Sequence, residues 1–549
     1  MAQHAASVPG PATTAPTRRR ASRAPAKTTL RPWQQRAVSA MADWVDGPFL
    51  VAAAPGAGKT VPALHAARQL LRTRSIGRVA VVCPTAPLTR QWAAAAASMG
   101  LQLAPDAANL RPPAGFDGVA VTYARVAQSG ARWAKQCSPG TFVIADEAHH
   151  LGDELAWGQG FNAAFATAAR RLLLSGTPFR SDAAPIPGVR YDSDGIAVPD
   201  VTYSYADAVR DGVCRPVTFV PYDGVLQWQS GEETIEASFA DAVHSREAAR
   251  RYRTAISVEL ADGLPRILAA AHAKLLEIRS GGHRDAGGLI VAADGEHARA
   301  VAKVLRGVTG KPPLVVLHTE ARAAEKLAAF RSGREPWIVA VNMVSEGVDI
   351  PRLRVGVYAT AAKTPLIFRQ IVGRFVRTIP GRGLDMSWLY LPADPVLRAH
   401  AADVENDLSP ILRRLGLGAE ELLDEIPDRL ETEPSEAPAF VPLSADLSLT
   451  PQLALFGSPG GAAAPLPTFA SAVEDPLDDP GLPAFERRAL LRDKRHRLVS
   501  DLRRTDGRTH AEINAWLNRA TGITRVDDAS IDQLERSIAL LLDTLNRAR

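Results

Sequence analysis

The chain has 549 residues, which is too long for one hydrophobic core and predicts two or three domains joined by linkers. Its apolar fraction of 46% and charged fraction of 22% are typical of a globular protein in water, and no apolar run approaches the ~18 residues needed to span a bilayer. The net charge of +5 is too small to identify a nucleic-acid partner by itself.

The cysteines argue against a disulfide framework or a metal cluster. Cys83, Cys137 and Cys214 show no paired spacing and are too few to hold a four-ligand metal or iron–sulfur site. No apolar segment near the N-terminus resembles an export signal. We therefore expect a cytoplasmic protein that is not associated with a membrane.

Residues 1–27 predict a disordered basic tail. The first 42 residues contain seven Lys or Arg and no acidic residue, and Pro, Ala, Ser and Thr make up most of the rest. Such a tail is either a non-specific tether for phosphates or a solubilising extension. Composition does not separate the two.

From Leu30 to about Pro392, short apolar runs alternate with helical stretches, which predicts parallel sheets covered by helices on both faces. The fold class is α/β, with domains over residues 28–200 and 285–426. Residues 201–284 are expected to be a connector with helices at Ala248–Val258 and Leu264–Ile278. The ten candidate strands are Pro48–Ala54, Arg78–Pro84, Val119–Tyr123, Thr141–Glu147, Arg170–Thr177, Gly288–Ala293, Pro313–His318, Trp337–Asn342, Val355–Thr360 and Ser387–Pro392.

The sequence AAPGAGKT, Ala53 to Thr60, follows the apolar run PFLVAAA and predicts a phosphate-binding loop. A strand that leads through a glycine-rich turn into a helix presents backbone N–H groups to phosphates. Lys59 would reach the β- and γ-phosphates of ATP, and Thr60 would place a hydroxyl on Mg²⁺. The residues expected to surround the phosphates are Ala54, Pro55, Gly56, Ala57 and Gly58.

The segment VIADEAHH places Asp146 and Glu147 at the carboxyl end of a buried strand, where α/β sheets bind their ligands. Phosphoryl transfer requires an acid that holds the metal and a group that orients the attacking water. Asp146 suits the first task and Glu147 the second. Together with the phosphate loop, this pair predicts an ATP- and Mg²⁺-dependent hydrolase.

Composition changes abruptly after residue 426. Residues 427–483 contain eleven prolines, nine acidic residues and one basic residue, Arg429, which predicts a disordered acidic linker that does not fold against the preceding domain.

Residues 484–549 then return to helical patterning. The segment Phe485–Arg504 has eight Lys or Arg against three acids, and capping boxes begin at Thr509 and Ser530. We expect a small three-helix module. Its basic helix either binds a nucleic-acid backbone through Arg487, Arg488, Arg492 and Arg495 or is merely solvated.

Several of these segments together resemble a known family. AAPGAGKT, DEAH (Asp146–His149) and LSGTPF (Leu174–Phe179) resemble motifs I, II and III of the DEAD/DEAH-box superfamily 2 helicases, although Ala53 replaces the usual Gly. LRPWQ, PTAPLTRQW, VNMVSEGVDIP and QIVGRFVR resemble, in order, the adenine-recognition segment and motifs Ia, V and VI. The likeness covers about residues 28–395. LRPWQ and SGTPF are most similar to the DNA-repair and type III restriction-like branch.

This resemblance implies two tandem RecA-like domains, the second closing on ATP bound to the first. In the family, motif VI supplies Gln370 near the γ-phosphate and Arg374 and Arg377 for the charge that develops during transfer. Gln34 matches the position that reads adenine. The remaining matches are Gly347 and Asp349 of motif V, which contact the ribose, and His149, Ser175 and Thr177, which couple ATP state to strand binding.

In the family, single-stranded nucleic acid crosses both domains and is held mainly by phosphate contacts. The matching positions are Thr85, Thr122 and Arg125 in the first domain and His318 and Thr319 in the second. A threonine at a strand end is also a common helix cap, so this alternative stays open. The branch resemblance favours DNA over RNA.

Three functions compete. The leading hypothesis is an ATP-dependent helicase or translocase acting on DNA. The second is the motor and recruitment subunit of a larger restriction, repair or defence complex, with the C-terminal module binding a protein partner. The third, a binding protein with a relic ATP site, conflicts with the intact motif residues.

Overall fold

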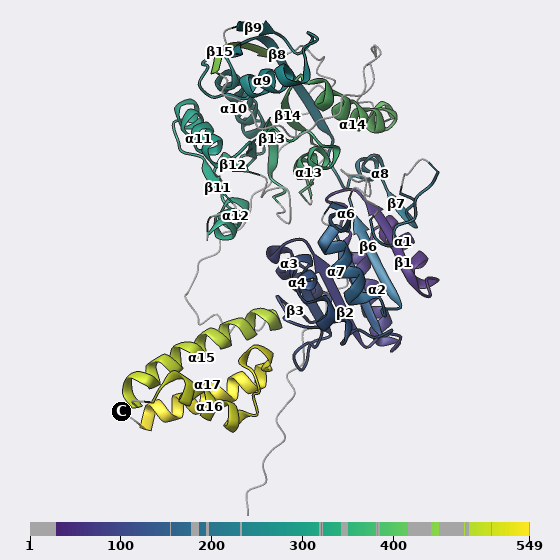
Figure 1. Ribbon diagram of the computed structural model, residues 1–549, viewed down its shortest axis with the longest axis vertical. Helices are drawn as coiled ribbons and strands as arrows, with labels where there is room; N and C mark the ends of the chain where they lie inside the picture. The colour runs from purple at the N-terminus through teal and green to yellow at the C-terminus, as the bar shows by residue number, and fades with distance from the viewer. Residues whose placement is uncertain are drawn as a thin grey trace, which may run out of the picture.

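The computed structural model contains two α/β units and a C-terminal helical bundle, coloured from purple at the N-terminus to yellow at the C-terminus in Figure 1. The described residues are 29–153, 155–176, 186–193, 197–230, 233–317, 320, 322–341, 350–379, 381–382, 385–414, 441–449, 477, 482–506 and 508–547. Within these residues, no helix combines the length and the low polarity that crossing a bilayer requires.

Seven parallel strands form the sheet of the first unit, in the order β3-β4-β2-β5-β6-β1-β7. Successive residues of a strand point to opposite faces, so strands that are apolar throughout need helices on both sides. Helices α1, α2 and α3 cover one face, and α4 to α7 cover the other. The strands are β1 Gly47–Ala53, β2 Arg78–Cys83, β3 Leu103–Pro105, β4 Gly118–Thr122, β5 Thr141–Asp146, β6 Arg170–Ser175 and β7 Val201–Tyr203. The helices are α1 Pro32–Ala42, α2 Thr60–Arg72, α3 Ala86–Ser98, α4 Tyr123–Gln128, α5 Gly130–Ala134, α6 His150–Asp153, α7 Leu155–Phe165 and α8 Tyr205–Arg210.

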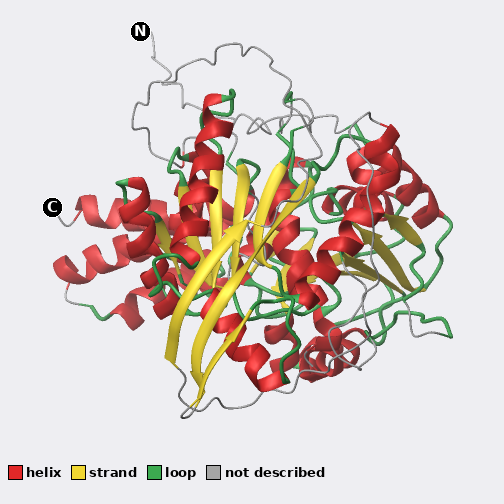
Figure 2. Cartoon of the chain, turned by 90° about the horizontal axis from the view of Figure 1, so that it is seen from above, coloured by secondary structure: helices red, strands yellow, loops and turns green. Residues whose placement is uncertain are grey.

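The second unit contains an eight-stranded sheet in the order β11-β12-β10-β13-β14-β8-β15, with β9 paired to β8. Only β9 and β15 are antiparallel to their neighbour. Figure 2 shows the long strands of the molecule lying between helices. The strands are β8 Val217–Ser230, β9 Glu233–Ala237, β10 Gly287–Ala292, β11 Leu314–Val316, β12 Trp337–Val341, β13 Leu353–Ala359, β14 Ser387–Pro392 and β15 Val441–Leu449. The helices are α9 Ser245–Ala255, α10 Leu264–Ser280, α11 Gly295–Thr309, α12 Ala323–Ser332, α13 Pro365–Phe375 and α14 Pro395–Arg414.

All ten predicted strands are present to within about two residues of their predicted bounds, and the α/β fold class is confirmed. The two helices predicted in the connector correspond to α9 and α10. The predicted connector 201–284 nevertheless needs a correction. Its first residues form β7 at the edge of the first sheet, and β8 pairs in parallel with β14 inside the second sheet. Much of this stretch therefore belongs to the two sheets.

The expectation that the acidic stretch 427–483 does not fold against the preceding domain is wrong for β15. This strand pairs with β8, and Ala445 and Leu447 are buried while Asp446 between them faces outward and pairs with Arg266 at 2.8 Å. Gly224 of β8 allows the close approach, because a Cβ there would lie 1.8 Å from the main-chain oxygen of Asp446. A short alternating segment thus forms a strand within a composition that predicts disorder.

The predicted three-helix module is present as α15 Ala484–Asp506, α16 His510–Thr521 and α17 Ile531–Arg547, with a 3-10 turn at Val526–Asp528. Both predicted capping boxes form, since Thr509 and Glu512 bond reciprocally, as do Ser530 and Gln533. Leu534, Ile538 and Leu541 fill its core, whereas Leu542 is 42% exposed. In Figure 1 the start of α15 lies beside β3 of the first unit.

Candidate functional site

The phosphate loop joins β1 to α2 in the conformation that the sequence predicts. Gly56 and Gly58 have φ values of +81° and +86°, a left-handed region that favours glycine. A Cβ at Gly58 would lie 3.1 Å from the side-chain nitrogen of Gln34. Lys59 follows the loop, and Thr60 is the first residue of α2. The backbone of the loop and the N-terminus of α2 therefore face the same region, where a phosphate could bind.

The start of α1 is bonded to this loop. Gln34 is 3% exposed and donates from Nε2 to the Gly58 oxygen at 3.1 Å, while its Oε1 accepts from the Arg31 N–H at 2.9 Å. The Arg31 guanidinium donates to the Ala57 oxygen at 3.0 Å. Gln34 is thus beside the nucleotide loop, and its base-reading role stays a prediction. Sequence reasoning missed Arg31, although it lies within LRPWQ.

Asp146 is the last residue of β5 and is 7% exposed. Its Oδ2 accepts from Trp92 Nε1 at 2.8 Å, and its Oδ1 accepts from the Glu147 N–H at 3.1 Å. Burial and the neighbouring Glu147 charge raise the pKa of Asp146 to about 6, against the opposing effect of Lys59. The pKa of this carboxyl group is therefore closer to neutrality than that of an exposed aspartate. Sequence reasoning assigned no role to Trp92, the last residue of PTAPLTRQW.

Glu147 faces the lysine of the phosphate loop. Lys59 Nζ lies 3.1 Å from Glu147 Oε1, and this ammonium overcomes the effect of burial and lowers the pKa of Glu147 to about 2. Glu147 also has a φ of +50°, an uncommon conformation for a residue with a side chain. Strain of this kind gathers at functional sites. The Glu147 carboxylate is therefore ionised and held beside Lys59, at the end of the phosphate loop.

His149 continues the same line of contacts. It is 1% exposed, and its Nδ1 lies 3.0 Å from Ser175 Oγ and 3.6 Å from Glu147 Oε2. Burial lowers the pKa of His149 to about 3, so the ring is neutral at pH 7. Two of the three predicted coupling residues are thus in contact. The third, Thr177, lies outside the described residues.

The second unit reaches this site through α13. Gln370 Nε2 lies 3.4 Å from His149 Nε2. Arg374 is 8% exposed, and Arg377 follows the helix. A Cβ at Gly373 would lie 2.7 Å from Pro55 Cβ, so α13 packs directly on the phosphate loop. The structure therefore brings Gln370 and the predicted loop residues together across the two units.

The segment between the units lies against both sides of this contact. Cys214 Sγ donates to the Pro55 oxygen at 3.5 Å, and the Arg215 N–H donates to the Val376 oxygen at 2.7 Å. Thr378 Oγ1 donates to the Val213 oxygen at 3.0 Å. Burial raises the pKa of the Cys214 thiol to about 12, so this cysteine packs as an apolar group. Sequence reasoning missed this segment because nothing in its composition marks it.

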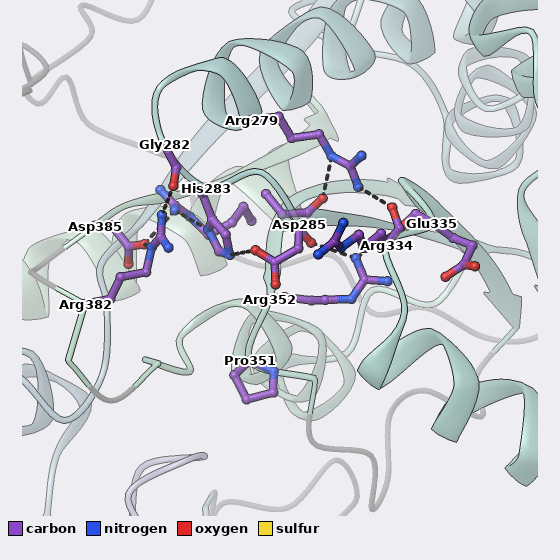
Figure 3. A network of polar contacts seen from close by, with 12 residues as sticks. Arg279, Gly282, His283, Asp285, Arg334, Glu335, Pro351, Arg352, Arg382 and Asp385 are labelled. Carbon is purple, nitrogen blue, oxygen red and sulfur yellow. Dashed lines mark hydrogen bonds and ion pairs between the residues drawn. The ribbon is translucent and has the colours of Figure 1, made fainter. Parts of the chain in front are cut away.

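Buried charges fix the start of β13, just after the predicted motif V, as Figure 3 shows. Arg352 donates to the main-chain oxygens of Phe330, Asp285 and Glu335. Arg354 pairs with Asp385 at 2.6 Å. These bonds anchor the segment that follows motif V. Gly347 and Asp349 of that motif lie outside the described residues.

The predicted nucleic-acid contacts are only partly described. Thr85 and Thr122 are the N-caps of α3 and α4, and Thr122 Oγ1 accepts from the Arg125 N–H at 3.3 Å. The capping alternative is therefore correct for Thr122, and its strand contact stays a prediction. Arg125 is exposed and donates to the Asp106 oxygen at 2.7 Å. The two predicted contacts of the second unit, His318 and Thr319, lie outside the described residues.

The four arginines predicted to bind a phosphate backbone all make bonds within the C-terminal bundle. Burial corrects that interpretation for Arg488 and Arg495, whereas for the part-exposed Arg487 and Arg492 it stays a prediction. Arg487 pairs with Glu535 at 2.7 Å, and Arg492 pairs with Asp527. Arg488 is 8% exposed and donates to the main-chain oxygens of Ala529 and Asp527. Arg495 is 3% exposed and donates to Asn514 and Asn518. These four side chains therefore join α15 to the rest of the bundle.

Two family descriptions match the chain. Residues 27–180 match "Type III restriction enzyme, res subunit", and residues 290–378 match "Helicase conserved C-terminal domain". The first covers the phosphate loop and the Asp146–Glu147 pair, and the second includes α13. The matches therefore fall on the two units whose contact forms the site.

Individual proteins are also similar. "Uncharacterized protein Rv2917" of Mycobacterium tuberculosis is 42% identical over 84% of this chain and 78% of its own length. "Uncharacterized protein ML1624" of Mycobacterium leprae is 41% identical over 70% of this chain and 65% of its own. Among solved structures, Dbp5 of S. cerevisiae bound to RNA and ADP BeF3 is 14% identical, covering 69% of this chain and 87% of that chain, with a TM-score of 0.44. The ATP-dependent Type ISP restriction-modification enzyme LlaBIII bound to DNA is 16% identical, covering 70% of this chain and 30% of that chain, also with a TM-score of 0.44.

Proposed function

The chain belongs to the superfamily 2 helicases, in a type III restriction-like family shared with Rv2917, and from this premise we propose that it is an ATP-driven motor that moves along DNA. The observation that carries the proposal is the line of contacts from Lys59 through Glu147 and His149 to Gln370. It joins the phosphate loop to the second unit. A nucleotide bound there would touch both units and couple hydrolysis to their relative movement.

The residues fit ATP and Mg²⁺. Gly56 and Gly58 have the positive φ values that a phosphate-binding loop uses, and Lys59 is already placed beside an anion, Glu147. Mg²⁺ commonly takes one or two protein oxygens, with phosphates and water filling its other positions. Thr60 and the buried Asp146 would supply those oxygens. Bound Mg²⁺ would neutralise phosphate charge.

Glu147, Arg374 and Arg377 would then have different roles in hydrolysis. A γ-phosphate competes with Glu147 for Lys59, and a released Glu147 carboxylate is free to orient water for attack. Arg374 and Arg377 would donate to the charge that develops on the transferred group. These roles require the second unit to be in contact with the loop, as Gly373 is with Pro55.

DNA is proposed over RNA because the chain resembles the DNA-repair and restriction branch. Three free cysteines favour a reducing compartment, so we propose a cytoplasmic location. The deciding experiment measures ATP hydrolysis by the full chain with single-stranded DNA, duplex DNA or RNA added at equal nucleotide concentration. We expect DNA to raise turnover at least severalfold above basal. Equal stimulation by RNA would remove the DNA preference, and no stimulation by any polymer would contradict the motor.

A second function is the motor and recruitment subunit of a larger restriction, repair or defence complex. It is supported by Arg488 and Arg495, which are buried and bonded within the bundle, so that two of the four arginines expected to contact DNA are turned inward. Deleting residues 484–549 should then leave DNA affinity and its salt dependence unchanged in equilibrium titrations. A lower affinity whose deficit shrinks as salt rises would instead identify a DNA tether.

A further inference from the structure

Two buried aromatic side chains donate hydrogen bonds to Asp146. Trp92 Nε1 donates to Oδ2 at 2.8 Å, and the Tyr123 hydroxyl donates to the main-chain oxygen, also at 2.8 Å. The two rings are 2% and 1% exposed, so neither donor can turn to water without unpacking the core. Asp146 is thus fixed at its carboxylate and at its backbone, by two different helices.

Each of these helices begins at a residue that is predicted to contact a nucleic-acid strand. Trp92 lies on α3, whose N-cap is Thr85, and Tyr123 is the first residue of α4, whose N-cap is Thr122. The residues proposed to contact the nucleic acid, Thr85 and Thr122, are thus the ones from which these two helices start. Close-packed side chains transmit small displacements, because they have no room to absorb them. A shift of either helix therefore changes a bond to Asp146.

Asp106 joins the two helices. Its Oδ1 accepts from Thr89 Oγ1 at 3.1 Å, its Oδ2 lies 3.4 Å from Arg90 Nε, and its main-chain oxygen accepts from Arg125 at 2.7 Å. Thr89 and Arg90 belong to α3, and Arg125 belongs to α4. Asp106 has a φ of +56°, so the chain turns sharply to present these acceptors. Asp106 therefore links α3 to α4 near their starts.

We propose that Trp92 and Tyr123 are positioning residues, which transmit strand binding at the starts of α3 and α4 to the metal-holding carboxylate of Asp146. The inference rests on the motor function proposed above. A neutral donor on Oδ2 fixes the rotation of the carboxylate and leaves its other lone pairs for a cation. Binding of a strand changes how well Asp146 is aligned, and this sets the rate of hydrolysis.

The test compares Trp92→Phe with Trp133→Phe in the full chain. Each change keeps a buried aromatic ring in the first unit, but Trp133 Nε1 has no hydrogen-bond partner among the described residues, so its replacement removes no bond. ATP hydrolysis is measured against Mg²⁺ concentration, with and without a thymidine oligonucleotide, and oligonucleotide binding is measured separately. For Trp92→Phe we expect the half-saturating Mg²⁺ concentration to rise and the stimulation ratio to fall, each by roughly tenfold, because the lost bond is to a charged group. Oligonucleotide affinity should change less than about twofold, and Trp133→Phe should behave as wild type.

Tyr123→Phe is the second variant, because it removes only a hydroxyl, and it decides the question if Trp92→Phe fails to fold. It should lower the stimulation ratio without weakening oligonucleotide binding. A wild-type protein that no polymer stimulates would overturn the motor function itself. A stimulated wild type, with both variants matching Trp133→Phe in Mg²⁺ dependence and stimulation, would overturn the coupling role alone.

Discussion

The side-chain amide of Gln370 lies 3.4 Å from the imidazole of His149, so the second unit directly contacts the buried end of the proposed ATP site. Because burial keeps His149 neutral, only one of its ring nitrogens can donate a hydrogen bond. A change of partner at one nitrogen therefore changes what the other can do. This ring connects Glu147 to Gln370 of α13.

Lys59→Ala and Glu147→Gln should separate nucleotide binding from hydrolysis. Removing the ammonium of Lys59 takes away the charge that faces the phosphates, so ATP affinity should be lost. Glu147→Gln keeps the shape of the side chain and removes the carboxylate that orients water, so ATP should still bind while turnover falls by at least about 100-fold. Equilibrium binding and steady-state rates on the same preparations check this, with the exposed Lys303→Ala as a control. Wild-type turnover in Glu147→Gln would show that Glu147 does not orient the attacking water.

Replacing Arg374 or Arg377 by Ala should reduce turnover far more than nucleotide affinity. Arginines that donate to the developing charge are worth ~10³–10⁵ in rate, because the charge exists mainly in the transition state. Arg374→Lys keeps the charge but loses the planar fork, so it should fall between wild type and Ala. Affinity and turnover are measured together. A large loss of affinity with unchanged turnover would place these arginines outside the transition state.

The end point of a C-terminal truncation should decide whether the second unit stays stable. A chain that ends at residue 426 lacks β15, which uncovers one edge of β8 and the apolar surface that Ala445 and Leu447 bury. A chain that ends at residue 450 keeps the strand and is the matched control. We expect the shorter chain to melt on the order of 5–10 °C lower, from the loss of a buried Leu, a buried Ala and one set of strand bonds.

Gly224→Ala tests the same contact with one residue. A Cβ at this position would meet the Asp446 oxygen at 1.8 Å, so β15 must move away from β8. Melting of this variant should resemble that of the chain ending at 426. If both melt like the control, β15 contributes nothing to the stability of the second unit.

Glu405 on α14 should make stability fall as pH rises toward neutrality. Burial raises the pKa of Glu405 to about 7, although the Phe219 N–H opposes the effect. Below pH ~4.5 the group is protonated in both folded and unfolded chains, and no cost arises. Between pH ~4.5 and 7 the unfolded chain ionises first, so the folded state loses on the order of 2 kcal/mol after allowance for partial exposure.

Glu405→Gln should remove this cost. Its free energy of unfolding, measured by urea titration from pH 4.5 to 8, should rise relative to wild type as pH rises through that window and then level off. Glu325→Gln, whose side chain is 78% exposed, is the control for loss of a carboxylate. A constant difference between wild type and Glu405→Gln at all pH values would contradict the raised pKa.

The sequence predicts the two sheets and the phosphate loop because each depends on residues that are close together in the chain. A buried parallel strand needs an unbroken apolar run, and a phosphate loop needs glycines with positive φ beside a lysine. Strand β8 was missed because Pro221 and Gly224 interrupt its pattern, although Gly224 is what admits β15. That requirement is visible only when the two strands are seen together.

Other misses also depend on partners that are distant in the chain. The charges on α15 predict solvent or phosphate contacts, but the carbonyls of Asp527 and Ala529 that accept from Arg488 follow some forty residues later. The hydrogen bond from Trp92 to Asp146 likewise joins α3 to β5, a strand that follows later in the chain. The composition of a segment shows how many charged and aromatic residues it contains, but it does not show which distant residues they contact.

The position of β8 also has a consequence for how the protein is made. On the ribosome, β8 is complete at Ser230, but its parallel partner β14 begins at Ser387 and its other partner β15 ends only at Leu449. At ~5–20 residues per second, the interval before β14 emerges is on the order of ten to thirty seconds. During that time the first part of β8 has an unpaired edge on the side of β14 and an open one on the side of β15, because β9 pairs only with its last five residues, Leu226–Ser230. Synthesis of this chain therefore passes through a long stage in which β8 lacks its partners β14 and β15, and chaperones that shield such strands should raise the yield of folded protein.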